Sequence, residues 1–144
     1  MSEHRLMADR VVRAARAWIG TPYRHGASRR GVGCDCLGLL RGVWREVVGL
    51  EPAPVPPYAP EWAELRDDEP LLDAVARHLP SGAMEPGAVL VFRWSAAAAA
   101  KHCGILVAPD RMVHAYSGLG TIESPLVPAW RRRIVATHRF PVRA

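Results

Sequence analysis

Apolar residues in the first third of the chain recur at the spacing of an amphipathic helix. Two sets have this spacing: Met7, Val11, Ala14 and Trp18, then Leu37, Leu40, Val43 (or Trp44) and Val47. Side chains three or four residues apart share one face of a helix, so the sets predict helices over residues 5–18 and 36–48 with these faces buried. Gly20 and Pro22 are expected to end the first helix, and Gly49 the second.

The segments between and after these helices lack such a repeat. Residues 24–34 are rich in Gly and Arg, which indicates a loop. Five prolines over residues 51–60 forbid a helix and favour an extended surface crossing within the domain. A short helix is predicted over residues 70–79, because Pro70 suits its first position and the acidic residues 67–69 precede it.

The second half of the chain is rich in strand-forming residues. Strands are predicted over residues 88–94, 102–108, 111–116, 121–123 and 133–140, with a hairpin loop over residues 95–100 and a turn at residues 109–110. Helices followed by an antiparallel sheet define the α+β class. With 144 residues, the chain has the length of one domain, 1–144.

Composition and charge narrow the choice of partner. The chain is 49% apolar, which suits a folded domain, and its formal net charge is +5. A modest positive charge fits an acidic polymer such as nucleic acid or an anionic cell wall, and it fits ordinary solubility equally well. No segment alternates Arg with aromatic residues as a platform for single-stranded nucleic acid does, so we expect no nucleic-acid partner.

The sequence predicts neither secretion by the general route nor insertion into a membrane. Residues 1–10 lack an apolar core behind a basic cap, so they do not resemble a secretory signal. No apolar run approaches the roughly 18 residues of a membrane span. We therefore expect a protein that is made in the cytoplasm and has no membrane partner.

Cys36 is the candidate nucleophile, because it begins a predicted helix directly after the glycine-rich loop. Unpaired N–H groups in the first turn of a helix create a positive potential, which lowers the pKa of a thiol and makes its thiolate nucleophilic. The same N–H groups can hold an oxyanion. Asp35 suits the helix cap, and Gly38 allows the close approach of a substrate or of another backbone.

A thiolate nucleophile requires a base, since a free cysteine alone is more often a small buried residue. His102 is the candidate base, at the start of a predicted strand. His114 lies 12 residues further on and can face His102 across the predicted hairpin, where it would orient the His102 ring as the third member of a triad. His25, in the loop before Cys36, is a further candidate for substrate contact.

A metal site is the alternative use of the same residues. The four candidate ligands are Cys34, Cys36, His102 and Cys103. Their spacings match zinc motifs poorly, and on a strand His102 and Cys103 point to opposite faces. Three cysteines also make a poor disulfide framework. We therefore expect no metal and no cofactor, and we predict that Cys103 lies in the core.

Four short motifs, in this order and spacing, resemble the NlpC family of cell-wall cysteine peptidases over about residues 5–125. The motifs are GTPYR at residues 20–24, DCLGL at residues 35–39, HCGI at residues 102–105 and MVHA at residues 112–115. Within the family, GCDCLGL at residues 33–39 and RGVWRE at residues 41–46 most resemble the short tail peptidases of phages and gene transfer agents.

The resemblance implies a papain-like fold, with the nucleophile at a helix N-terminus packed on a C-terminal antiparallel sheet. It implies an endopeptidase that cleaves peptidoglycan stem peptides, typically between D-glutamate and a diamino acid. Cys36 would then be the nucleophile, His102 the base and His114 the orienting residue. The oxyanion- or substrate-binding residues would be Tyr23, Asp35 and Gly38. Two positions depart from the family: Leu37 replaces its usual Ser, and Cys103 replaces a frequent Val.

Two alternatives to an endopeptidase remain open at the level of the sequence. One is a tail-tip structural protein that keeps the fold with little or no catalysis. The other is an amidase or acyl transferase that uses the same thiolate, since the shape of the pocket decides between such reactions. The family's usual signal peptide and wall-binding repeats are absent from the sequence. This favours a component of a phage-like particle, which would deliver the protein to the periplasm and cell wall.

Overall fold

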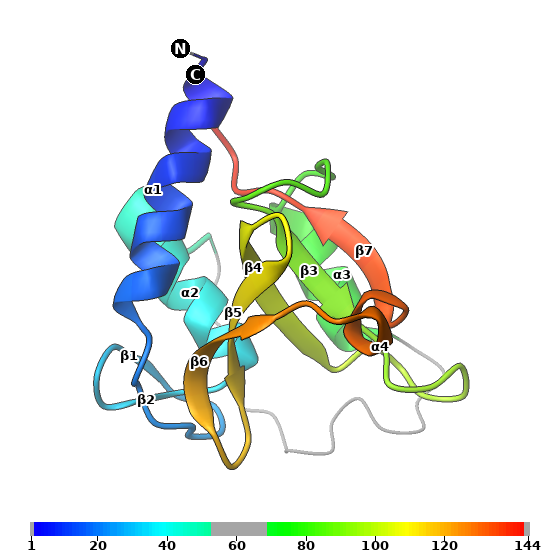
Figure 1. Cartoon of the computed structure of the whole chain (residues 1–144). Coiled ribbons are helices and arrows are strands. Elements are labelled where there is room, and N and C mark those ends of the chain that lie inside the picture. Colours follow the sequence, from blue (N-terminus) through cyan, green and yellow to red (C-terminus); the bar gives the residue numbers. More distant parts are fainter. Residues whose placement is uncertain (1, 53–68, 143–144) are drawn as a thin grey trace.

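The core of the molecule is a five-stranded antiparallel sheet with two helices packed on one face (Figure 1). The structure is a computed structural model that describes residues 2–52 and 69–142. Helices precede the sheet along the chain, so the predicted α+β class is confirmed. The predicted extended crossing falls mostly on residues 53–60, which lie outside the described residues.

Helix α1 (Glu3–Ala17) buries the apolar face that its sequence predicts. The Oγ of Ser2 accepts a hydrogen bond from the Arg5 N–H at 3.1 Å and caps the helix N-terminus. The predicted stripe of Met7, Val11, Ala14 and Trp18 is buried.

Helix α2 (Cys36–Val47) packs against α1 and against strand β4. Its buried face is centred on Leu39 and Val43, with Leu40 and Val47 beside them. Leu37 was predicted to be buried but is only half-buried, because it falls at the margin of this face together with Trp44. The two helices approach closely at Gly42, where a Cβ would stand 1.9 Å from the Trp18 ring.

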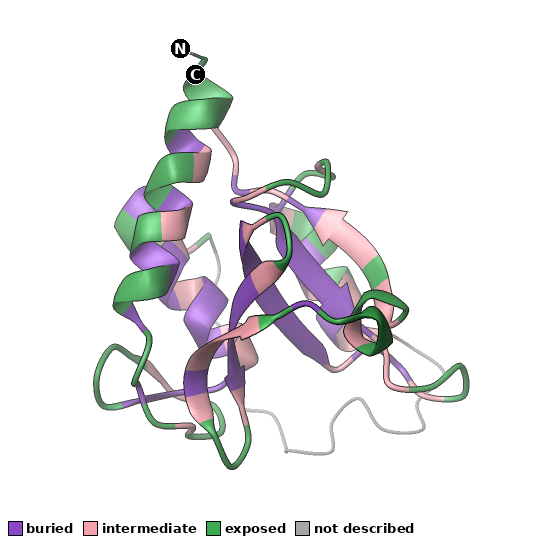
Figure 2. Cartoon of the chain, in the orientation of Figure 1, coloured by how far each residue is buried: buried purple, intermediate pink, exposed green. Residues whose placement is uncertain are grey.

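The sheet consists of strands β3 (Val89–Phe92), β4 (His102–Ala108), β5 (Arg111–Tyr116), β6 (Gly120–Pro125) and β7 (Ile134–His138), in the order β6-β5-β4-β3-β7. The predicted bounds of β4 and β5 and the turn between them are confirmed. The predicted loop over residues 95–100 lies within the connection of residues 93–101 between β3 and β4, and β3 is shorter than the predicted strand 88–94. Figure 2 shows that β3 and β4 are buried along almost their whole length.

The two faces of the sheet bury different sets of side chains. One face carries Val91, Cys103, Ile105 and other residues that join α1 and α2 in the larger core cluster. The opposite face carries Phe92, Leu106 and others in a smaller cluster. Cys103 is fully buried in the larger cluster, so its predicted core position is confirmed.

Four short elements complete the described part of the chain. Helix α3 (Pro70–His78) has Pro70 in its first turn, as predicted. Strands β1 (Ser28–Arg29) and β2 (Gly33–Cys34) pair antiparallel within the predicted loop, and helix α4 (Pro128–Arg131) precedes β7. These last three elements were not predicted, because two to four residues are too few to show a repeat.

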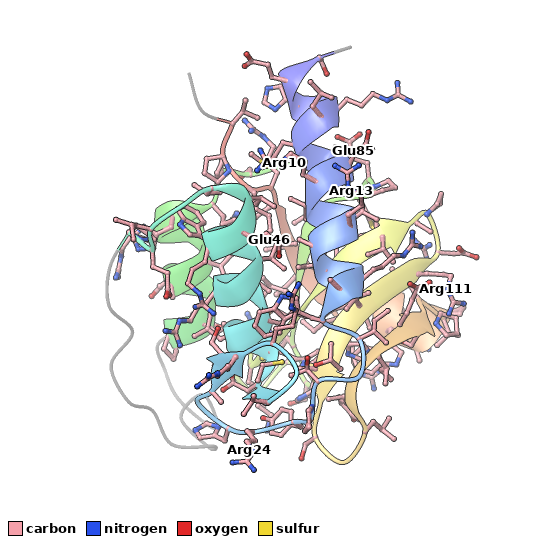
Figure 3. All side chains as sticks on the ribbon, turned by 90° about the vertical axis from the view of Figure 1, so that its left-hand side faces the viewer. Arg10, Arg13, Arg24, Glu46, Glu85 and Arg111 are labelled. Carbon is pink, nitrogen blue, oxygen red and sulfur yellow. The ribbon has the colours of Figure 1, made fainter. Side chains whose placement is uncertain are left out.

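One charged side chain of α1, that of Arg16, links the helix to the edge strand β6. Glu123 of β6 accepts contacts from Arg16 at 2.9 Å and from Arg111 at 2.8 Å. Arg10 and Arg13 project from the outer surface of the same helix (Figure 3). In the described ranges, none of the helices has the length and apolar character that a bilayer crossing requires.

Candidate active site

Cys36 is the first residue of α2, and its position is fixed by hydrogen bonds between the helix start and the preceding loop. The two carboxylate oxygens of Asp35 accept hydrogen bonds from the N–H groups of Gly38 and Gly26, each at 2.7 Å. Asp35 is therefore the helix cap, as predicted. The resemblance also implied that Asp35 contacts the substrate, and this stays a prediction. The side chain is buried, which does not favour such a contact.

Gly38 lets the loop approach the first turn of α2. A Cβ at this position would stand 1.8 Å from the carbonyl oxygen of Ala27. The Oγ of Ser28 also donates to the carbonyl oxygen of Gly38 at 2.6 Å. The sequence left two uses open for this glycine, close approach of a substrate or of another backbone. In the structure the backbone of Ala27 occupies this space.

His102 begins strand β4, close to Cys36. The Sγ of Cys36 lies 3.9 Å from the carbonyl oxygen of Lys101, the residue before His102. Cys36 therefore lies beside the candidate base.

His114 meets His102 across the β4–β5 hairpin, as predicted. The Nε2 of His102 and the Nδ1 of His114 are 2.9 Å apart, and both side chains are buried. Because Nε2 of His102 is engaged with His114, the ring nitrogen left for Cys36 is Nδ1.

Ser124 contacts His114, and this contact was not predicted from the sequence. Its Oγ lies 3.0 Å from the Nε2 of His114. In the β5–β6 ladder His114 faces Ile122, so Ser124 is its diagonal neighbour on the same face. A serine in an edge strand gives no sequence signal of its own, and the contact depends on the register of β6.

An aromatic cluster surrounds the two histidines on this face of the sheet. The Trp94 ring is stacked on the His102 ring, with centroids 5.6 Å apart and planes inclined by 23°. Trp130 contacts the rings of His102 and His114 at 5.7 and 5.2 Å, and Tyr116 lies 5.8 Å from His102. Trp130 was not predicted, because α4, which carries it, was not predicted. Trp94 and Tyr116 fall in the segments predicted as strands 88–94 and 111–116, but they were not predicted as neighbours of the histidines.

The thiol of Cys36 has a pKa below the usual value. A hydrogen bond from the buried Cys103 thiol is the largest cause. Burial of Cys36 opposes this effect, whereas a hydrogen bond and the charge of His102 add to it. In turn, the pKa of Cys103 is raised well above its usual value by Cys36 and by burial, so Cys103 stays a neutral donor. Cys103 was predicted only as a core residue, and this contact was missed.

His114 is neutral near neutral pH. Burial, and then the charge of His102, lower the pKa of His114 to about 3. A neutral imidazole carries one N–H and one acceptor nitrogen, so His114 can both accept from His102 and donate to Ser124.

Tyr23 is half-buried and forms an isolated bridge with Cys34, two residues before Cys36. Burial is the main cause that raises its pKa to about 12, and negative charge on Cys36 and Asp35 adds to the shift. The Tyr23 hydroxyl is therefore a donor at any neutral pH. His25, the further candidate, lies with its Nδ1 3.8 Å from Oδ2 of Asp35 and is part of the loop around the helix cap.

The remaining candidate metal ligand, Cys34, points elsewhere. Its Sγ is buried and lies 3.2 Å from the Oγ1 of Thr121. Among residues 2–52 and 69–142, no group of three or more His, Cys, Asp or Glu side chains has a geometry that could hold a metal ion.

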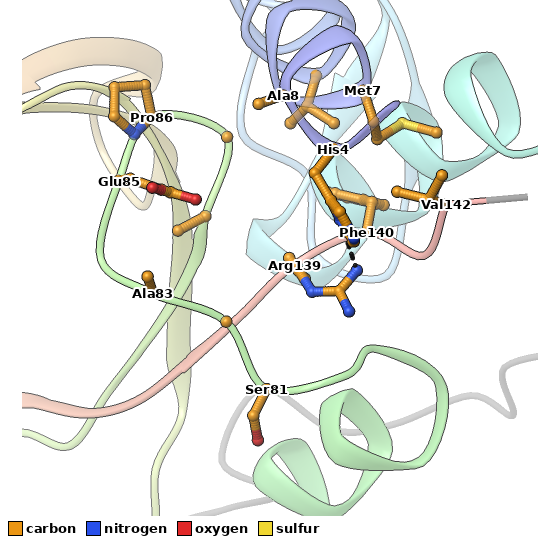
Figure 4. Close-up of a pocket in the computed structure, with 14 residues that line it drawn as sticks. His4, Met7, Ala8, Ser81, Ala83, Glu85, Pro86, Arg139, Phe140 and Val142 are labelled. Atoms are coloured by element: carbon orange, nitrogen blue, oxygen red, sulfur yellow. Dashed lines mark hydrogen bonds between the residues drawn. The ribbon is translucent and has the colours of Figure 1, made fainter. Parts of the chain in front are cut away.

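A cavity of about 430 Å³ lies apart from these residues, between α1, the loop of residues 81–88 and the C-terminal segment (Figure 4). Met7 and Phe140 contribute to its lining, and Arg139 and His4 form a 3.2 Å hydrogen bond there. Neither Cys36 nor any histidine of the site lines it.

A thiol at a helix N-terminus, beside a histidine at the start of an antiparallel strand, defines the papain-like fold class of cysteine hydrolases. The sequence model of the NlpC/P60 family matches residues 20–139, and the chain belongs to this family. Members of the family are cysteine peptidases that hydrolyse peptidoglycan.

Two curated relatives have related sequences. The chain is 28% identical over 131 residues to the gamma-DL-glutamyl hydrolase of Bacillus subtilis (strain 168), a match that covers 90% of this chain and 29% of that protein. It is 29% identical over 117 residues to the murein DD-endopeptidase MepS/murein LD-carboxypeptidase of Escherichia coli (strain K12), which covers 81% and 54%. The chain thus spans only about a third to a half of the length of these relatives.

Solved structures of the family share the fold. NlpC2 from Trichomonas vaginalis superposes with a TM-score of 0.65 at 17% identity, over 93% of this chain and 46% of that chain. The NlpC/p60 domain of the peptidoglycan hydrolase SagA gives a TM-score of 0.58 at 21% identity, over 83% of this chain and 89% of that chain. At these identities the likeness establishes the papain-like fold alone.

Proposed function

We propose that this protein hydrolyses the stem peptides of bacterial peptidoglycan, with Cys36 as the nucleophile, His102 as the base and His114 as the orienting residue. The observation that carries the proposal is the position of the Cys36 thiol at the start of α2, 3.9 Å from the carbonyl oxygen of Lys101, the residue before His102. His102 is itself hydrogen-bonded to His114 at 2.9 Å. Membership in a family of peptidoglycan-hydrolysing cysteine peptidases supports this substrate class.

The mechanism follows from the positions of these groups. Cys36 and His102 form a thiolate–imidazolium pair, and the thiolate attacks the carbonyl carbon of the scissile amide. N–H groups at the start of α2 and the Tyr23 hydroxyl stabilise the oxyanion. Nδ1 of His102 then protonates the leaving amine, and an acyl-enzyme remains on Cys36. Water, deprotonated by His102, hydrolyses the thioester and restores the thiol.

The bond between D-glutamate and the diamino acid is the proposed site of cleavage. The family resemblance of the four motifs supports this choice, and so does the name of the Bacillus subtilis relative, a gamma-DL-glutamyl hydrolase. The name of the Escherichia coli relative, a murein DD-endopeptidase/LD-carboxypeptidase, supports a murein substrate but indicates other bonds. Product masses decide between these bonds.

The test is digestion of purified peptidoglycan by the wild-type protein and by Cys36→Ala, with soluble products identified by mass spectrometry. We expect fragments cut after D-glutamate from the wild type and none from the variant. Equal release by the two proteins would contradict the role of Cys36. If neither protein released fragments, the structural tail-tip alternative would be favoured, whereas transfer of an acyl group to an added amine would indicate an acyl transferase.

We also propose that the protein is a component of a phage-like tail that assists penetration of the cell wall. The support is the resemblance of residues 33–39 and 41–46 to the tail peptidases of phages and gene transfer agents. Particles purified from the producing strain should contain the protein in a fixed ratio to tail proteins when analysed by quantitative mass spectrometry. Detection only in the particle-free fraction would contradict this role.

A further inference from the structure

We propose that Ser124 is a positioning residue, which accepts a hydrogen bond from His114 and thereby fixes the direction of the proton in the contact between His114 and His102. This inference rests on the proposed function, because it assigns Ser124 a role in the same reaction. The inference is based on two consecutive contacts between side chains. His102 Nε2 lies 2.9 Å from His114 Nδ1, and His114 Nε2 lies 3.0 Å from Ser124 Oγ.

The direction of the proton follows from the state that His102 must reach. To protonate a leaving amine, His102 must be an imidazolium, which has an N–H at both ring nitrogens and no acceptor. Its Nε2–H therefore donates to His114, and Nδ1 of His114 must be the acceptor. A neutral His114 then carries its single proton on Nε2, which points at the Oγ of Ser124.

His114 cannot relieve this constraint by changing its charge or its surroundings. It is buried, and its pKa of about 3 keeps it neutral over the working range of a thiolate enzyme. If Ser124 lacked an oxygen, the Nε2–H of His114 would have no acceptor from this residue when His102 is charged. A buried N–H without a partner raises the free energy of that state, so the hydroxyl stabilises the thiolate–imidazolium pair.

The other titratable groups around His102, His114 and Ser124 are unchanged in the variants that test this proposal. They are Cys103, Asp35 and Tyr23 near Cys36, and Tyr116 next to the two histidines. A change that follows the residue at position 124 is therefore not caused by the removal of one of these groups.

The experiment compares four proteins: wild type, Ser124→Ala, Ser124→Thr and the control Ser117→Ala, which alters an exposed serine in the turn between β5 and β6. The first readout is the rate of Cys36 alkylation by iodoacetamide as a function of pH, followed on the Cys36 peptide by mass spectrometry. It requires no substrate. In Ser124→Ala we expect the midpoint to move to higher pH by about half a unit to one unit.

The second readout is steady-state cleavage of a soluble stem peptide. Ser124→Ala should lower kcat about 3–10-fold with little change in KM, because the hydroxyl acts on the histidine pair and does not touch the substrate. Ser124→Thr, which keeps the hydroxyl, should restore both the alkylation profile and kcat. Ser117→Ala should behave as the wild type.

The tautomer can be observed directly by ¹⁵N NMR of histidine-labelled protein with a substrate-free site. The wild-type spectrum should show His114 with its proton on Nε2, and Ser124→Ala should lose this preference. If Ser124→Ala does not fold, the wild-type spectrum alone still tests the proposal. A wild-type His114 protonated on Nδ1, or an Ser124→Ala protein with unchanged kcat and alkylation profile, would overturn it. Failure of the proposed function is distinguishable, because the wild type would then cleave no peptide whatever its tautomer.

Discussion

The two halves of the candidate active site are built in different ways. The nucleophile half is local: Asp35, Cys36 and Gly38 follow one another, and backbone contacts to Gly26 and Ala27 hold them. The histidine half joins side chains from three strands, β4, β5 and β6, through His102, His114 and Ser124.

Because of this difference, the two halves are sensitive to different kinds of substitution. Close backbone contacts hold the helix start at Cys36, so a substitution that adds volume there disturbs its position. The histidines are fixed by hydrogen bonds between side chains, so they are sensitive to the loss of a donor or an acceptor and to pH. Substitutions that change only volume or only hydrogen bonding can therefore address one half at a time.

The largest effect is expected from removal of the base in the histidine half. His102→Gln keeps a polar side chain but cannot take a proton from Cys36 or return it to the leaving amine. The rate of stem-peptide cleavage should fall about 10²–10⁴-fold, measured with a soluble peptide substrate. His78→Gln, in α3 and outside the site, should keep the wild-type rate. Comparable rates for His102→Gln and His78→Gln would contradict the assignment.

Added volume should break the nucleophile half. In Gly38→Ala the new Cβ would stand 1.8 Å from the Ala27 carbonyl, a backbone atom that the loop cannot move easily. The free energy of unfolding should fall by about 1–3 kcal/mol in urea denaturation, with a loss of cleavage. The matched control is Gly33→Ala, whose Cβ meets side-chain atoms of the exposed Arg24, so its loss should be smaller. The reverse order would show that Gly38 does not set this contact.

Acid should destabilise the histidine half through His114. Its pKa is about 3 in the fold and about 6.5 when unfolded, so below pH 6.5 the unfolded chain binds a proton that the folded chain does not. Stability is therefore full above this value and falls as the pH falls towards 3. We expect a loss of about 1–2 kcal/mol between about pH 7 and pH 5 by urea denaturation. The loss should be smaller in His114→Asn, and an equal loss would contradict this cause.

The smallest effect is expected where the two halves meet, at Cys103. Cys103→Val removes the thiol that donates to Cys36, so the pKa of Cys36 should rise. The pH profile of Cys36 alkylation should move upwards by less than about one unit, whereas Cys103→Ser should keep the donor and most of the profile. If Val and Ser gave the same profile, the hydrogen bond would have no part in the low pKa.

The local half of the site was predictable from sequence, and the cross-strand half only in part. The helix start at Cys36, the cap at Asp35 and the hairpin that brings His102 to His114 all follow from patterns of a few residues, and the structure bears out each of them. The fold class followed in the same way, from helical spacing early in the chain and strand-forming residues later.

What the sequence did not predict depends on register and on packing between distant segments. The contact of Ser124 with His114 requires the pairing of β6 on β5, and the aromatic ring of Trp130 reaches the histidines through the short helix α4. Cys103 was predicted to lie in the core but not to contact Cys36, because strand periodicity gives the face of a residue and not its neighbours at the strand end. The buried face of α2 is also centred closer to Leu39 than the sequence predicted.

The separation along the chain between the parts of the site has a consequence for folding. Cys36 and the Lys101 carbonyl that it meets are 65 residues apart, and the contact of Arg16 with Glu123 joins residues 107 apart. Contacts of such long range form slowly and late, because the intervening chain must first lose its conformational freedom. A nascent or partly folded chain therefore contains the thiol without its base, and the paired nucleophile exists only once the sheet has closed against α2.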